Sequence, residues 1–111
     1  MVKDCLFCKI VAGEIPAKIA YQDEHCVAFH DINAQAPVHV LVIPREHVAS
    51  IAELSDGLCG PLMRAIHKVA ELLGIGAGYR VVTNRGEDAG QTVFHLHWHV
   101  LGGRKMTWPP G

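Results

Sequence analysis

The 111-residue sequence lacks long hydrophobic runs, repeats, linkers and low-complexity segments. Its longest apolar stretches, such as VHVLVIP at 38–44, are far too short to cross a bilayer. The N-terminal MVKDCLFCKI also lacks the architecture of a signal peptide. Half of the residues are nevertheless hydrophobic, which is enough for a folded core at this length. We therefore expect one globular domain over residues 1–111, located in the cytoplasm and without membrane contact.

An excess of charge of either sign is also missing. Ten basic residues nearly balance eleven acidic ones, and the formal net charge is −1. The basic residues are spread singly along the chain, so they form no footprint for a nucleic acid polymer. The partners should be small molecules or proteins.

Cysteine is present but is not arranged for disulfides. In a cytoplasmic chain with eight histidines, the Cys5-x-x-Cys8 pair is better interpreted as half of a metal site or as a redox motif. No βαβ pattern surrounds the pair to support a redox role. Cys26 lies in an apolar strand-like segment and Cys59 near a predicted helix start, so both are expected to be small core side chains.

Hydrophobic periodicity predicts a short and a long helix. The short helix covers LFCKIVA, with Asp4 as its cap and Gly13 at its end, and the long helix runs from Pro61 to Leu73. Because the helices stand outside any βαβ rhythm, we expect an α+β fold with a five-stranded antiparallel meander. The expected strands are EIPAKIAYQD up to a turn at Asp23 and Glu24, HCVAFHD, VHVLVIP, YRVVTN and the segment FHLHWHVL at 94–101.

The segment FHLHWHVL carries three histidines at every second position. On a helix this spacing would scatter the rings, whereas on a strand it places His95, His97 and His99 on one face. Leu96, Trp98 and Val100 then share the other face. A metal-scavenging tract is the alternative, but the strict alternation with large apolar residues argues against it.

A neutral imidazole is a nucleophile near pH 7 without a base to activate it. If a backbone carbonyl holds its Nδ1–H, its Nε2 lone pair is aimed at an electrophile, and neighbouring imidazoles can donate to that electrophile's oxygens. The preceding loop GEDAGQT favours phosphorus, because Gly86 and Gly90 allow an anion nest and Gln91 and Thr92 add donors. No Walker-type lysine follows, and Lys and Arg are scarce nearby, so a single phosphate is expected rather than a triphosphate.

The run from His95 to Leu101 resembles the His-φ-His-φ-His-φ-φ signature of the histidine triad superfamily. Four longer runs, KIVAGEIPAKI, AFHDINAQAPVHVLVIPREH, GYRVVTNRGEDAGQT and VLGGRKMTWPPG, resemble its nucleotide-binding (Hint) branch almost from end to end. The resemblance implies a HIT-like fold and a homodimer that binds purine nucleoside monophosphates, AMP or GMP. It also implies hydrolysis of nucleoside phosphoramidates through a nucleotidylated histidine, with no cofactor required for catalysis.

The resemblance also implies roles for individual residues. His97 would be the nucleophile, His99 would contact the phosphate and His39 would position the triad. Thr92 stands where the family usually has a serine that donates to the leaving nitrogen, and it adds a methyl group. Asp31 would accept both ribose hydroxyls, as a carboxylate can. The other implied nucleotide contacts are Phe7, Ile10, Phe29 and Ile32 around the base, for which plain core packing is the alternative, and His30, Asn84, Gly90 and Gln91.

Relatives with a Cys-x-x-Cys hold a structural zinc. By that resemblance, the ligands here would be Cys5, Cys8, His47 and His95, a set suited to tetrahedral zinc. His95 would then be removed from phosphate contact. The alternative is that the two thiols are simply buried and that His47 is a surface residue.

Two further function classes remain open. One is a nucleotide-binding interaction module with vestigial catalysis, and the other is a dinucleoside polyphosphate hydrolase, against which the WPPG ending and the lack of basic residues weigh. Dimerisation is expected because Leu58, Met63 and Leu72 lie off the apolar stripe of the long helix. The resemblance implies that Trp108 reaches the partner's nucleotide site, and a frayed terminus is the alternative.

Overall fold

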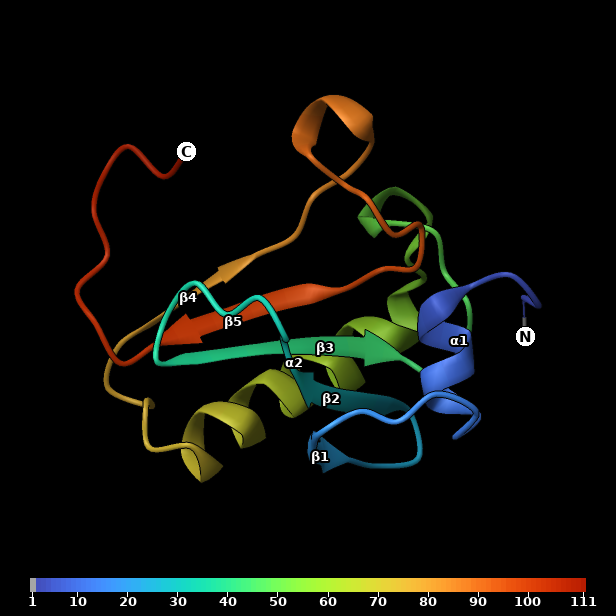
Figure 1. Cartoon of the computed structure of the whole chain (residues 1–111), viewed down its shortest axis with the longest axis horizontal. Helices are drawn as coiled ribbons and strands as arrows, with labels where there is room; N and C mark the ends of the chain where they lie inside the picture. Colours follow the sequence, from blue (N-terminus) through green and yellow to red (C-terminus); the bar gives the residue numbers. More distant parts are fainter. Residues whose placement is uncertain (1) are drawn as a thin grey trace.

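The computed structural model describes residues 2–111, which form one antiparallel sheet of five strands with helices on both of its faces (Figure 1). The strands are β1 (Ile19–Gln22), β2 (Cys26–His30), β3 (Val38–Pro44), β4 (Tyr79–Val82) and β5 (Trp98–Gly102). The helices are α1 (Leu6–Val11) and α2 (Asp56–Leu72), with short 3-10 turns η1 (Ile51–Glu53) and η2 (Glu87–Ala89). This arrangement confirms the predicted α+β class. None of the helices in this part of the chain combines the length and apolarity that a bilayer crossing requires.

The sheet order is β1-β2-β3-β5-β4, and every neighbouring pair is antiparallel. The first three strands form the expected meander. After α2, β4 takes the edge of the sheet and leaves the position beside β3 open, and β5 then fills this position between β3 and β4. This order matters for the site, because it pairs Leu41 with His99 and His39 with Leu101 across β3 and β5.

Both faces of the central strands are buried, because each face is covered by a different helix. Val40 and Val42 of β3 pack with α2 residues such as Ile66 in the larger core cluster. Leu41 and Ile43 face the other way and belong to a second cluster that includes Phe7 and Cys8 of α1. A strand alternates its side chains between faces, so β3 serves two cores, which explains its continuous apolar run. Burying each such side chain stabilises the fold by roughly 1.5–3 kcal/mol.

Helix α2 begins at Asp56 with Ser55 as its N-cap, so the predicted start at Pro61 was wrong. Proline is common in a first turn, but here it lies further along the helix and is itself buried. The earlier start places Cys59 on the outer surface, where it is exposed rather than in the core. Leu58 is half-buried against the larger core, whereas Met63 and Leu72 are exposed as expected.

The structure also tests three predictions about the ends of α1 and the burial of Cys26. The N-cap of α1 is Cys5 and not Asp4, and its Sγ accepts a hydrogen bond from the Cys8 N–H at 3.3 Å. Gly13 follows the helix with φ 77°, a conformation that favours glycine, so its role as a stop is confirmed. Cys26 is fully buried, as predicted.

The histidine segment is only partly a strand. β5 begins at Trp98, so His95 and His97 precede the sheet instead of lying in it. Their backbone is held by single contacts, among them the Leu96 N–H, which donates to the Val48 carbonyl at 2.6 Å. The predicted separation of side chains still holds, because Leu96 and Val100 lie in the larger core on the α2 side.

Candidate functional site

Three imidazoles meet on the sheet face opposite α2. His39 comes from β3, His99 from β5 and His97 from the residues just before β5. Ring centroids are 5.2 Å apart for His39 and His99, and 5.0 Å apart for His97 and His99. The sheet order therefore brings together histidines that are 60 residues apart in the sequence.

A chain of hydrogen bonds determines which nitrogen of each ring carries the proton. The Gln35 N–H donates to His39 Nδ1 at 3.0 Å, so the proton of a neutral His39 is on Nε2. His39 Nε2 lies 2.9 Å from His99 Nδ1, and donation along this line leaves His99 with its proton on Nε2. Asp31 Oδ2 is 3.4 Å from the same His39 nitrogen. His99 is thus a fixed hydrogen-bond donor through Nε2.

His97 has the complementary arrangement. Its Nδ1 lies 2.8 Å from the carbonyl oxygen of His95, to which it donates its proton. Its Nε2 then carries a lone pair of fixed direction. The Thr83 hydroxyl donates to the His97 carbonyl at 2.9 Å and holds the backbone at this point. Nothing in the sequence distinguished Thr83 from an ordinary strand residue.

Burial keeps the supporting histidines uncharged. It lowers the pKa of His99 from 6.5 to about 4, and the neighbouring His97 and His39 add to the shift while Asp31 opposes it. Burial also lowers the pKa of His39, again against the nearby Asp31 carboxylate. At neutral pH this chain of rings is therefore neutral and retains its donor and acceptor pattern.

The apolar residues predicted around the base differ in how deeply they are buried. Phe7 is buried and packs edge-on against the His97 ring at 5.1 Å and against Phe29 at 5.4 Å. Ile10 is half-buried beside the second core. Ile32 is 96 % exposed in the turn after β2 and has no core partner. Core packing thus accounts for Phe7 and Phe29 but not for Ile32.

The glycine loop before the histidines is braced by Gln91. Its side-chain amide donates to the carbonyls of Ala49 at 2.8 Å and Val93 at 3.1 Å, and its amide oxygen accepts from the Gly86 N–H at 2.9 Å. The side chain is almost fully buried. Both of its donors are therefore bonded within the protein, so Gln91 shapes the loop rather than offering these donors to an anion. Gly86 and Gly90 have φ of 87° and 91°, which explains the glycines at these turns.

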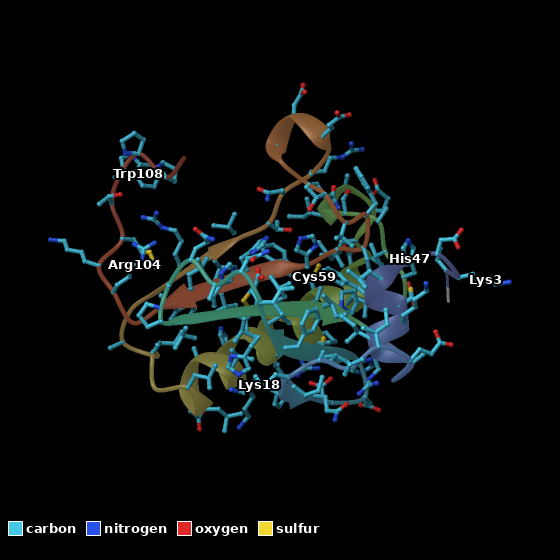
Figure 2. The ribbon with its side chains drawn as sticks, in the orientation of Figure 1. Lys3, Lys18, His47, Cys59, Arg104 and Trp108 are labelled. Carbon is cyan, nitrogen blue, oxygen red and sulfur yellow. The ribbon has the colours of Figure 1, made fainter. Side chains whose placement is uncertain are left out.

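Other predicted contact residues lie at the margin of the site. Thr92 is exposed, and His30 and Asn84 are half-buried. Trp108 is 80 % exposed in the tail that follows β5 (Figure 2). Arg80 holds this tail, since it donates to the Thr107 carbonyl at 3.0 Å and its guanidinium lies 5.9 Å from the Trp108 ring.

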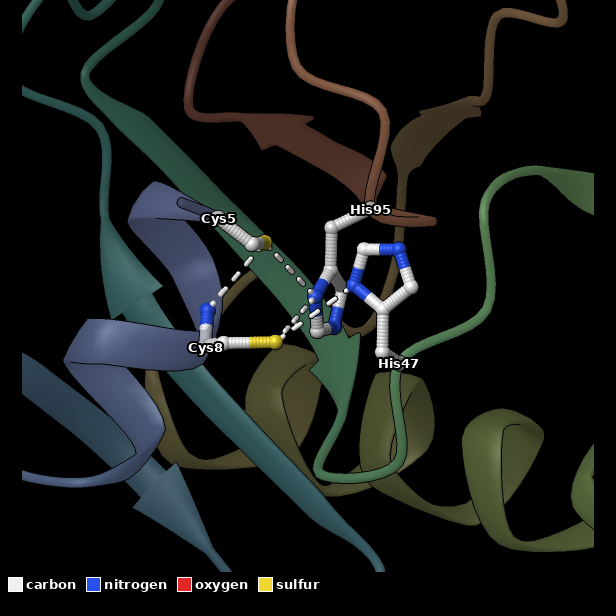
Figure 3. Close-up of side chains that lie close together, drawn as sticks. All are labelled: Cys5, Cys8, His47 and His95. Carbon is white, nitrogen blue, oxygen red and sulfur yellow. Dashed lines mark hydrogen bonds between the residues drawn. The ribbon is translucent and has the colours of Figure 1, made fainter. Parts of the chain in front are cut away.

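Cys5, Cys8, His47 and His95 form a separate cluster (Figure 3). His95 Nδ1 lies 3.3 Å from Cys5 Sγ and 3.5 Å from Cys8 Sγ, and His47 Nδ1 lies 3.4 Å from Cys8 Sγ. His95 Nε2 donates to the Pro44 carbonyl at 2.8 Å, which leaves Nδ1 free to act as a ligand. All four ligand atoms lie within 4.8 Å of one another, so the cluster can hold a metal ion.

The donor set and its spacing are compatible with tetrahedral coordination of a metal such as zinc. Tetrahedral zinc with Zn–S near 2.3 Å and Zn–N near 2.0 Å separates sulfur and nitrogen by about 3.5 Å, which matches the distances in the cluster. Burial lowers the pKa of His95 to about 4, so the ring is in the neutral form that binds metals. Without a metal, burial chiefly raises the pKa of Cys5 and so disfavours its thiolate.

Comparison with known proteins gives consistent results over nearly the whole chain. The model of the family "HIT domain" matches residues 12–106. A HIT-like protein of Synechocystis is 49% identical over 114 residues, which cover all of both proteins. A HIT family hydrolase from Legionella pneumophila is 46% identical with a TM-score of 0.92, over 97% of this chain and all of that one. A histidine triad nucleotide-binding protein from Candida albicans is 31% identical with a TM-score of 0.85, over 96% and 83% of the two chains.

Proposed function

Because this chain belongs to the HIT domain family, we propose that it is a purine nucleoside phosphoramidase that acts through a nucleotidyl-histidine. One observation carries the proposal. His97 Nδ1 donates to the His95 carbonyl at 2.8 Å, which directs the Nε2 lone pair outward beside His99, a fixed donor. A nucleophile and an oxyanion donor on one face suit transfer at a charged, tetrahedral centre such as phosphorus. The similarity to a HIT family hydrolase supports hydrolysis as the reaction class.

The reaction follows from these two rings. His97 Nε2 attacks the phosphorus of a nucleoside 5′-phosphoramidate, a P–N bond to the ring forms, and the bond to the amine breaks. The leaving nitrogen takes up a proton from solvent, and we assign the Thr92 hydroxyl as its hydrogen-bond donor. Water then attacks the phosphorus, the bond to His97 breaks and a proton returns to solvent, which releases the nucleoside monophosphate and the neutral imidazole. His99 Nε2–H donates to a phosphoryl oxygen in both steps.

The nucleotide would lie between the short helix and the turn after β2. The exposed Ile32 and the half-buried Ile10 offer apolar surface to a purine, next to the Phe7 and Phe29 rings. The Asp31 carboxylate is half-buried, and within residues 2–111 its hydrogen-bond donor is the Asn33 N–H. His39 Nε2 lies 3.4 Å away but gives its proton to His99, so the carboxylate retains lone pairs for ribose hydroxyls. The nucleotide binding named for the Candida albicans relative supports this assignment.

We further propose that the Cys5, Cys8, His47 and His95 cluster holds one structural zinc ion per chain. A bound zinc would supply a closed tetrahedral cross-link between the N-terminal helix and the histidine segment. None of its four ligands touches the phosphorus, so protein that carries its zinc should need no further metal for activity. Elemental analysis of the purified, reduced protein tests the assignment, and protein without zinc would contradict it.

A twofold dimer is the expected working form. Met63 and Leu72 on α2 and Trp108 on the tail are large apolar side chains with exposures of 47, 60 and 80 %. A self-complementary interface would remove such surface from water. In the dimer, Trp108 would line the leaving-group side of the partner's site. Sedimentation equilibrium tests the dimer, and a monomer at micromolar concentration would contradict it.

The decisive experiment is turnover of an adenosine 5′-phosphoramidate by the wild type and by His97→Ala. We expect the variant to lose activity while it remains folded, and the exposed His67→Ala to serve as a matched control with full activity. Mass spectrometry of a quenched reaction should place the nucleotide on His97. Tight AMP binding without turnover would favour a nucleotide-binding module, and faster cleavage of a dinucleoside polyphosphate would favour that hydrolase instead.

A further inference from the structure

One residue links the metal cluster to the nucleophile. The His95 ring directs Nδ1 towards the two cysteine sulfurs and donates from Nε2 to the Pro44 carbonyl, while its own backbone carbonyl accepts the Nδ1–H of His97. The ring is fully buried. Any shift of His95 therefore moves the acceptor that fixes the orientation of the His97 ring.

The backbone around His95 is held by isolated hydrogen bonds. β5 begins only at Trp98, so no ladder of sheet hydrogen bonds holds the preceding residues. The Leu96 N–H donates to Val48, Gln91 donates to the Val93 carbonyl, and the Thr83 hydroxyl donates to the His97 carbonyl. These contacts flank His95 but do not fix its ring against α1. The ring makes its polar contacts with α1 through its Nδ1, which lies 3.3 Å from Cys5 Sγ and 3.5 Å from Cys8 Sγ. Neutral thiols form only weak hydrogen bonds, so these two contacts hold the ring weakly.

A second route from the cluster to the nucleophile runs through α1. This helix has only six residues, which is too short to be stable by itself. Cys5 is its N-cap and Cys8 lies within it, and Phe7 between them packs edge-on against the rings of His95 at 5.9 Å and His97 at 5.1 Å. Whatever holds α1 against His95 thus also holds the aromatic wall of His97.

From these contacts we propose that metal binding by Cys5, Cys8, His47 and His95 positions the nucleophile. The metal fixes the His95 carbonyl and the Phe7 ring at once, and together they hold His97 in the tautomer with Nδ1 protonated and Nε2 free. The four ligands are positioning residues and do not touch the substrate. The kinetic consequence rests on the proposed function, whereas the effect on the His97 ring does not.

The test reads the His97 ring directly. In protein labelled with ¹⁵N at histidine, the ring nitrogen shifts report which nitrogen carries the proton, with His97→Ala assigning the signals. The cluster borders a cavity of about 430 Å³ lined in part by Cys5 and His47, which gives a chelator access. We expect chelation to convert the His97 signals to a mixture of tautomers and one equivalent of Zn²⁺ to restore them.

Two variants and a control complete the experiment. Cys8→Ser removes a buried ligand, and His47→Ala removes a half-buried one from a loop, with less risk to the core. Both should reproduce the chelated spectrum, whereas Cys59→Ser, an exposed cysteine outside the cluster, should not. We expect the rate of nucleotidyl transfer to fall roughly 10- to 100-fold in the two ligand variants, as is common when the support of an active residue is lost.

The outcomes separate this proposal from the proposed function. Unchanged His97 signals in stripped protein would overturn it even if phosphoramidates are hydrolysed, and failure of Zn²⁺ to bind would do the same. Metal-dependent signals without any turnover would support it and reject the phosphoramidase. Loss of near-ultraviolet circular dichroism over the whole chain on chelation would show that the metal folds the domain, and the local positioning role would then be rejected.

Discussion

The half-buried, neutral His99 predicts a specific loss of stability in acid. Its pKa falls from 6.5 to about 4 on folding, mainly because burial penalises the charged ring, with His97 and His39 adding to the shift and Asp31 opposing it. At pH values between these two pKa values, His99 is protonated in the unfolded chain and neutral in the folded chain. The free energy of unfolding should therefore decrease as the pH falls below about 6.5.

The size of this effect follows from the two pKa values. Between pH 7 and pH 5, the preferential protonation of the unfolded state at this one site lowers the free energy of unfolding by about 2 kcal/mol. The ring keeps some contact with solvent, which makes this figure an upper value. Below about pH 4 the folded state also takes up the proton, and this contribution stops growing.

The assay is denaturant unfolding at a series of pH values for the wild type, His99→Gln and His25→Gln. His99→Gln removes the titrating group, so its stability should decline less between pH 7 and pH 5 than that of the wild type. His25 is exposed, and its replacement should leave the decline unchanged. His39 and His95, whose pKa values are also lowered by burial, are present in all three proteins. An equal decline in wild type and His99→Gln would refute the reasoning.

Three further predictions concern the sheet, the glycine loop and the C-terminal tail. In Gly102→Ala the new Cβ would lie 2.8–2.9 Å from Ile75 atoms, so we expect a loss of about 1–3 kcal/mol in unfolding free energy, and a Tm equal to wild type would contradict it. Gln91→Leu removes three hydrogen bonds that brace the glycine loop, and we expect a loss of roughly 1–3 kcal/mol together with faster amide hydrogen exchange at Gly86. Deletion of residues 107–111 should slow hydrolysis selectively for phosphoramidates of bulky amines, and an unchanged selectivity profile would remove Trp108 from the partner's site.

Local patterns in the sequence predicted most of the elements. The third strand has the bounds expected from the run VHVLVIP, because seven successive strand-compatible residues follow Pro37 and end with Pro44. The long helix was placed several residues too late, since Pro61 matches a first-turn position while the Ser55-Asp56 start carries a weaker signal. The last strand was extended too far, because alternation continues through His95 and His97 although no neighbouring strand pairs with them.

Residue types and spacing also indicated which chemistry to expect. Three histidines at alternate positions beside a glycine loop favour a nucleophilic imidazole, and a Cys-x-x-Cys pair in a histidine-rich chain favours a metal. These inferences depend on the intrinsic properties of the side chains, which are already present in the sequence. The ligand set and the separate roles of the histidines came from the family resemblance and not from spacing.

The tertiary structure decided how each imidazole is used. The carbonyls of Pro44 and His95 hold opposite nitrogens of two nearby rings, so His95 is left with Nδ1 free and His97 with Nε2 free. Isolated imidazoles have no such distinction, because either nitrogen can carry the proton. His39 and the cysteines reach these rings only because β5 inserts beside β3 and α1 packs across the same face. The sequence determined which groups are available, and the folded backbone determined which atoms they present, because hydrogen-bond partners far apart in the chain select the tautomer.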